Sequence, residues 1–334
     1  MSTLDNKRWI KGLDSIRFVL AFIVLLSHYS TVLVYTLKIS PSNILRFCGL
    51  ILANTLDGTA AVMAFFILSG FVIHHHYKNG IVSIKQYAIR RFLRIFIPLI
   101  VIYVAGIKFN HPDKTVIWSL ICELIYYALY PLLAITKTSW LKKTFFIFII
   151  SFIIILAGAH RDVLAFFTQT GAYQGYYWQL GPFLTWIIGL PVWLLGVLIA
   201  ENVDNLKSIS FSKLSFYRFL IFTVSCLCVA GQLYWHISYI LSMNIFALLM
   251  YKWIKSEIAY FKNHQPNSLT ESMGKFSYSL YLCHPLIYAI LSIWLVNNMS
   301  TYILFVFLAV FISYLFYLIV EKPSHRLAMK LSRI

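Results

Sequence analysis

The sequence predicts an all-α membrane protein, a polytopic helical bundle with about ten transmembrane helices and both termini in the cytoplasm. Three observations predict this class. Hydrophobic residues make up 60% of the 334 residues and charged residues only 12%, whereas a soluble domain has about a quarter of its residues charged. The apolar residues gather in runs long enough to cross a bilayer. The lysines and arginines gather between alternate runs.

Ten apolar runs approach the roughly 20 residues that a membrane-spanning helix needs. We expect spans at 14–36, 58–77, 95–108, 117–135, 144–159, 181–200, 216–234, 237–254, 276–297 and 301–320. The first run follows Lys7, Arg8 and Lys11 and has no small-residue cleavage site. We therefore interpret it as a retained span and not as a signal peptide.

The distribution of basic residues sets the predicted orientation. With the N-terminus in the cytoplasm, most of the 28 lysines and arginines fall on the inner side. The outer segments hold only Lys38, Arg46, Lys108, Lys114 and Arg161. Such asymmetry is typical of membrane topology, so the net charge of +17 does not indicate a nucleic-acid partner. No large soluble domain remains, and we expect one integral-membrane domain over residues 1–334.

The first span carries ionisable side chains where a lipid-facing helix has none. Asp14 and Arg17 lie at its start and His28 lies well inside it. In a helix, the eleven residues from Arg17 to His28 make about three full turns, so both side chains leave the same face about 16 Å apart. Because buried charges are costly in lipid, such groups face a protein interior or a wet cavity. A structural hydrogen bond from His28 to a neighbouring helix is the alternative.

The second span combines small residues with a histidine triplet. Ser69 and Gly70 in its middle predict close helix packing. His74, His75 and His76 lie at its inner end, but no further ligands accompany them. The cysteines also lack zinc-ligand spacing with nearby histidines and are expected to be small core residues. We therefore predict no metal site.

Further charged residues flank or interrupt later spans. Arg91 and Arg94 share a helix face just before the third span, and such a pair suits phosphate groups. Arg90 beside them is interpreted as an ordinary inner anchor. Glu123 lies inside the fourth span, where a carboxylate needs a partner or a proton. Glu321 begins the last inner segment.

The outer loop at about 160–180 is rich in tyrosine and also holds a tryptophan. Aromatic residues at this position form either a belt at the membrane interface or a surface on which sugars stack. The belt is the interpretation that the sequence favours.

In order along the chain, the pieces LDSIR, FFILSGFVI, RFLRIFIP, WSLICELIYYALYP, GKFSYSLYLCHPL and VEKP are similar to those of the integral-membrane acyltransferase-3 family. This family acylates bacterial surface glycans, and the resemblance covers nearly the whole chain. By position, it implies that His28 is the essential histidine of the family. It likewise matches the family's functional residues to Arg17, Arg91, Arg94, Glu123 and Glu321.

The resemblance implies transfer of an acyl group, usually acetyl, from coenzyme A to a sugar hydroxyl in the bacterial inner membrane. We expect His28 as general base with Glu123 as its orienting group, and Arg17, Arg91, Arg94 and Glu321 at the site of the acyl-CoA. Burial is expected to keep His28 neutral. The acceptor would be an O-antigen, capsule, exopolysaccharide or other lipid-linked glycan.

Two alternatives stay open at this stage. Acyl transfer can be direct or can pass through an acyl-histidine, and the sequence does not separate the two routes. Ten spans with buried charges also suit a transporter of sugars or lipid-linked glycans. No inverted sequence repeat supports that second function.

Overall fold

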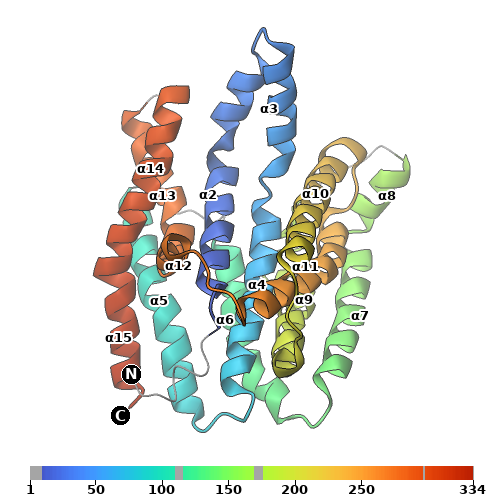
Figure 1. Cartoon of the computed structure of the whole chain (residues 1–334), viewed down its shortest axis with the longest axis vertical. Helices are drawn as coiled ribbons and strands as arrows, with labels where there is room; N and C mark the ends of the chain where they lie inside the picture. Colours follow the sequence, from blue (N-terminus) through green and yellow to red (C-terminus); the bar gives the residue numbers. More distant parts are fainter. Residues whose placement is uncertain (1–9, 110–115, 169–175, 296–297, 334) are drawn as a thin grey trace.

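The computed structural model describes residues 10–109, 116–168, 176–295 and 298–333. Within these ranges the chain is helical and has no strand (Figure 1). Its helices are α2 (Leu13–Lys38), α3 (Asn43–Thr55), α4 (Gly58–Tyr77), α5 (Ile84–Lys108), α6 (Ile117–Ile135), α7 (Trp140–Gly158), α8 (His160–Thr168), α9 (Thr185–Glu201), η1 (Val203–Asn205), α10 (Phe211–Trp235), α11 (Tyr239–Phe261), α12 (Ser268–Gly274), α13 (Ser277–Trp294), α14 (Met299–Phe316), η2 (Tyr317–Glu321) and α15 (Lys322–Leu331).

Each of the ten expected spans coincides with a helix for most of its length. By length and composition, five helices of the described chain can cross a membrane, or seven if two bent pairs each count as one span. The count of ten spans and the orientation of the termini remain predictions. Lys7 and Arg8 lie outside the described residues, as does the middle of the aromatic loop, 169–175.

The centre of the bundle is the pair of α4 and α9, which run parallel, with Ser69 beside Trp193 and His74 beside Glu201. Most residues of both helices are buried, and Trp193 of α9 is fully enclosed. Glycines bring the two backbones together: a Cβ on Gly196 would lie 1.9 Å from the carbonyl oxygen of Ile67, and one on Gly70 would lie 2.0 Å from that of Trp193. The close packing predicted from Ser69 and Gly70 is thus confirmed.

The outer helices bury much less of their surface. α7, α10 and α14 are strongly apolar but leave most of that surface uncovered by protein, as expected for helices that face lipid. α2 and α3 form a hairpin that extends beyond the ends of the neighbouring helices (Figure 1). α3 continues into α4 past Asp57, whose carboxylate accepts hydrogen bonds from the Ala60 N–H (2.9 Å) and the Tyr239 hydroxyl (2.5 Å).

α12 fixes the start of α2. The carboxylate of Glu271 accepts hydrogen bonds from the backbone N–H groups of Gly12 and Ser15, each at 3.1 Å, and from the Ser15 hydroxyl at 2.7 Å. A carboxylate is favourable here because the first N–H groups of a helix have no partner within the helix. This contact holds the first turn of α2, which carries Asp14 and Arg17, beside the turn between α12 and α13.

Candidate functional site

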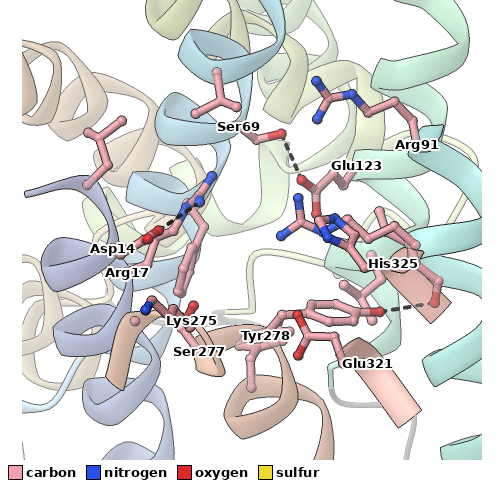
Figure 2. Close-up of a pocket in the computed structure, with 18 of the residues that line it drawn as sticks. Asp14, Arg17, Ser69, Arg91, Glu123, Lys275, Ser277, Tyr278, Glu321 and His325 are labelled. Atoms are coloured by element: carbon pink, nitrogen blue, oxygen red, sulfur yellow. Dashed lines mark hydrogen bonds and ion pairs between the residues drawn. The ribbon is translucent and has the colours of Figure 1, made fainter. Parts of the chain in front are cut away.

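A cavity of about 910 Å³ lies between α2, α4, α5, α6, α13 and the η2–α15 segment. Its walls include five residues that the sequence singled out, namely Arg17, Arg91, Arg94, Glu123 and Glu321. Ile10 and Met329, near the two ends of the described chain, also line it. Figure 2 shows the side chains of Arg17, Arg91, Glu123 and Glu321 directed toward one space from several helices. The site predicted in pieces along the sequence is therefore one cavity, except for His28.

Positive charge predominates in the wall of the cavity. Its cations are Arg17, Arg91, Arg94, Lys275, Lys322 and Arg326, and its carboxylates are Asp14, Glu123 and Glu321. The Arg17 guanidinium and the Asp14 carboxylate form an ion pair, with a nitrogen–oxygen distance of 3.3 Å. Six cations against three carboxylates leave an excess of three positive charges. Such a cavity attracts an anionic ligand of matching size.

Arg91 and Arg94 come from the first turns of α5. This helix begins after Ser83, whose hydroxyl caps it by accepting a hydrogen bond from the N–H of Gln86 at 3.3 Å. The guanidinium of Arg91 lies over the ring of Tyr77, 5.5 Å from its centre. Its buried Nε has no hydrogen-bond partner in the described part of the chain. A buried donor without a partner costs about 1–3 kcal/mol, so a ligand that accepts from it is strongly favoured.

Arg90 has a different environment. It does not line the cavity, and its Nε donates to the hydroxyl of Ser332 at 2.8 Å, which ties α5 to the C-terminal end of α15. The interpretation of Arg90 as an inner anchor of the membrane topology stays a prediction.

Glu123 lies at the inner wall of the cavity. Its carboxylate accepts a hydrogen bond from the Ser69 hydroxyl at 2.7 Å and another from the hydroxyl of Tyr127, one turn further along α6. Ser69 in turn accepts from the indole N–H of Trp193 at 3.3 Å. The carboxylate is thus fixed from two helices and directed toward the arginines (Figure 2).

Glu321 is placed by an irregular turn of the helix. Residues Tyr317–Glu321 form a π-helical turn in an otherwise α-helical segment. Pro323 follows, and because proline has no N–H and crowds the carbonyl of residue 319, the regular pattern cannot continue. The buried Glu321 carboxylate accepts a hydrogen bond from the Ser279 hydroxyl at 2.5 Å. The positive charges of Arg94 and Arg17 interact favourably with it.

His28 lies outside this cavity, eleven residues along α2 from Arg17. The sequence predicts a buried ring, and this prediction is wrong because the side chain of His28 is exposed. Just past His28, α2 bends by 59° between Leu13–Tyr29 and Val32–Lys38 and continues into its hairpin with α3 (Figure 1). The ring packs edge-on against that of His284, with the ring centres 4.9 Å apart.

The cavity and His28 are linked by two aromatic contacts. Tyr281 lines the cavity, and its hydroxyl forms a hydrogen bond of 2.6 Å with that of Ser119. The centre of the Tyr281 ring is 6.2 Å from that of His284, which in turn contacts His28. The rings of Tyr281 and His284 thus form two successive contacts that lead from the wall of the cavity to His28.

Sequence reasoning missed part of the cavity wall. The sequence places Lys275, Lys322 and Arg326 only among the inner-side basic residues and does not single out His325, yet all four line the cavity. One signal was available: Glu321 and His325 are one turn apart and share a helix face.

The histidine triplet is divided: His75 and His76 line the cavity, whereas His74 has structural contacts. His74 lies between the Tyr130 hydroxyl (3.0 Å) and the Glu201 carboxylate (2.6 Å). Among the described residues, no three His, Cys, Asp or Glu side chains are grouped as metal ligands would be.

Comparison with known proteins gives one match. The model of the acyltransferase-3 family, described as an acyltransferase domain, matches residues 10–318 of the 334-residue chain. No curated protein and no solved structure matches the chain.

Proposed function

The chain belongs to the acyltransferase-3 family, and we propose that it moves an acetyl group from acetyl-CoA to a hydroxyl of a glycan. The acceptor is a bacterial surface or lipid-linked glycan such as an O-antigen, a capsule or an exopolysaccharide. The protein acts in the cytoplasmic membrane with both termini inside. The observation that carries the proposal is the cationic cavity, whose inner end lies two ring contacts from His28.

The charge of the cavity fits the donor. Coenzyme A carries a diphosphate and a 3′-phosphate, and guanidinium groups bind phosphate oxygens in pairs. Arg91 offers an unpartnered Nε, and Arg94 and Arg17 act on Glu321 through their positive charges. We assign the phosphates to the arginines. Glu321 and Glu123 keep the arginine side chains in place, and the pantetheine arm extends along the cavity toward Tyr281.

The chemistry takes place at His28. An alcohol is a weak nucleophile at neutral pH, and a positioned imidazole that accepts its proton accelerates attack by about 10²–10⁴-fold. The acceptor oxygen attacks the thioester carbonyl carbon, the carbon–sulfur bond breaks, and the proton held by His28 passes to the leaving thiolate. Because His28 is exposed, a glycan has direct access to it. We favour this direct transfer over an acyl-histidine.

Membrane vesicles test both the donor and its side. Inverted vesicles that contain the protein should incorporate label from [14C]acetyl-CoA into their glycan fraction, because the cavity then faces the added donor. Sealed right-side-out vesicles should incorporate none. Equal labelling of the two, or none above vesicles from cells without the gene, would contradict the proposal and favour a carrier.

Arg91→Lys should raise the KM for acetyl-CoA about tenfold with little change in kcat. Lysine keeps the charge but cannot make paired hydrogen bonds, and a hydrogen bond to a charged group contributes about 1.5–3 kcal/mol. Arg90→Lys is the matched control, because Arg90 is the next residue on α5 and does not line the cavity. An unchanged KM in Arg91→Lys, or the same rise in both variants, would remove Arg91 from the donor site.

A further inference from the structure

A second histidine adjoins the proposed base. His284 lies on α13, is fully buried, and packs edge-on against His28. The two helices are joined at the same level, because the hydroxyl of Tyr29 donates to the backbone carbonyl of His284. His28 and Tyr29 are consecutive, so this hydrogen bond fixes which part of α13 faces His28.

The hydrogen bonds of His284 define its tautomer. Its Nδ1 lies 3.1 Å from the carbonyl oxygen of Leu280 and also interacts with that of Tyr281. The Tyr281 carbonyl is available because residue 285, its usual partner in the helix, is a proline without an N–H. A carbonyl oxygen only accepts, so Nδ1 carries the proton and Nε2 carries a lone pair.

The lone pair on Nε2 has no assigned use within the fold. Nε2 of His284 is buried and has no hydrogen-bond partner in the described chain. An unsatisfied buried acceptor costs about 1–3 kcal/mol, a cost that leucine or phenylalanine at this position would not incur. The neighbouring polar ring is that of His28. At a centre-to-centre distance of 4.9 Å, a small rotation of the exposed His28 side chain brings one of its ring nitrogens within hydrogen-bond reach of Nε2.

We propose that His284 is a positioning residue for His28: its Nε2 accepts a hydrogen bond from one ring nitrogen of His28. This bond leaves the other nitrogen of His28 unprotonated and directed at the acceptor hydroxyl. It also stabilises the imidazolium that forms when His28 takes the proton, as the third group of a catalytic triad does. Glu123, which the sequence suggests for this task, is bound by Ser69 and Tyr127 at the cavity. The inference rests on the proposed function, in which His28 is the base.

Three substitutions test the proposal. His284→Phe keeps a ring but has no nitrogen, and kcat should fall about 10- to 100-fold, which is less than the 10²–10⁴-fold that a positioned base itself contributes. The KM for acetyl-CoA should change less than twofold, because His284 does not line the cavity. His284→Gln carries an amide near the position of Nε2 and should recover at least tenfold in kcat over His284→Phe. Cys283→Ala, a buried change on the same turn, should keep the wild-type kcat.

Initial rates of label transfer give both kcat and the KM for acetyl-CoA. They are measured with [14C]acetyl-CoA, inverted vesicles and glycan from cells without the gene. In a His28→Ala background, His284→Phe should cause no further loss, since the two residues act as one unit. Any one of four results overturns the proposal. His284→Phe keeps the wild-type kcat, or His284→Gln shows no recovery. Alternatively, Cys283→Ala shows the same loss, or His284→Phe causes a further loss in the His28→Ala background. If His284→Phe does not accumulate, His284→Asn, which keeps the donor to Leu280 but lacks the acceptor, replaces it under the same criteria. Full transfer by His28→Ala alone would instead contradict the proposed function.

Discussion

Replacing His28 by alanine is expected to lower acetyl transfer by about 10²–10⁴-fold, the contribution typical of a positioned general base. The residues that we propose to bind the phosphates line a cavity that His28 does not touch. The variant should therefore retain the affinity of the wild type for acetyl-CoA while it loses turnover. Label transfer from [14C]acetyl-CoA in inverted vesicles measures turnover. Calorimetric titration of the protein with acetyl-CoA measures affinity.

Loss of structure does not explain such a result, because the side chain of His28 is exposed and alanine preserves the helix. His160→Ala is a suitable control, since it removes another exposed histidine, on α8, outside the proposed site. Normal transfer by His28→Ala would show that the base lies elsewhere.

Gly196→Ala is expected to cause the largest loss of stability. The added Cβ would lie 1.9 Å from the carbonyl oxygen of Ile67 and 2.6 Å from the backbone N of Phe71. Backbone atoms cannot rotate aside, so α4 and α9 must separate along the centre of the bundle. Overpacking of a core costs about 1–3 kcal/mol even where side chains can adjust, and we expect more here. The variant should unfold at clearly lower temperature in detergent and accumulate poorly in membranes.

Gly231→Ala provides the matched control. The nearest atom to its Cβ would be Cδ1 of Ile237, at 3.0 Å, and the end of that flexible side chain can move. In a helix interior alanine is favoured over glycine by about 1 kcal/mol, so this variant should be as stable as the wild type or more stable. Equal stability of Gly196→Ala and the wild type would contradict the close approach of α4 and α9.

Helix positions were largely predictable because apolar runs and charged interruptions are local features. α3 was missed because its run, Asn43–Thr55, is too short for a span by itself and includes Arg46. It forms because it continues the axis of α4 and pairs with α2. α15 was missed for the opposite reason: its sequence is charged, and it extends a membrane helix beyond the apolar run.

The candidate site was predictable in its residue types but not in its contacts. A charge inside an apolar run identifies Arg17, Glu123 and His28 without any structure. The partners of Glu123 depend on how α4 packs against α6, and the position of Glu321 depends on a π-helical turn. Neither feature has a periodic sequence pattern. The separation of His28 from the cavity likewise depends on where α2 leaves the bundle.

Mass spectrometry of surface glycans from cells with the intact gene, without it, and with His28→Ala tests the central claim most directly. The account predicts a mass increment of one acetyl group per glycan repeat that requires both the gene and His28. The same glycan masses in all three strains would contradict acetyl transfer to a surface glycan, and an increment that persists in His28→Ala would contradict the role of His28.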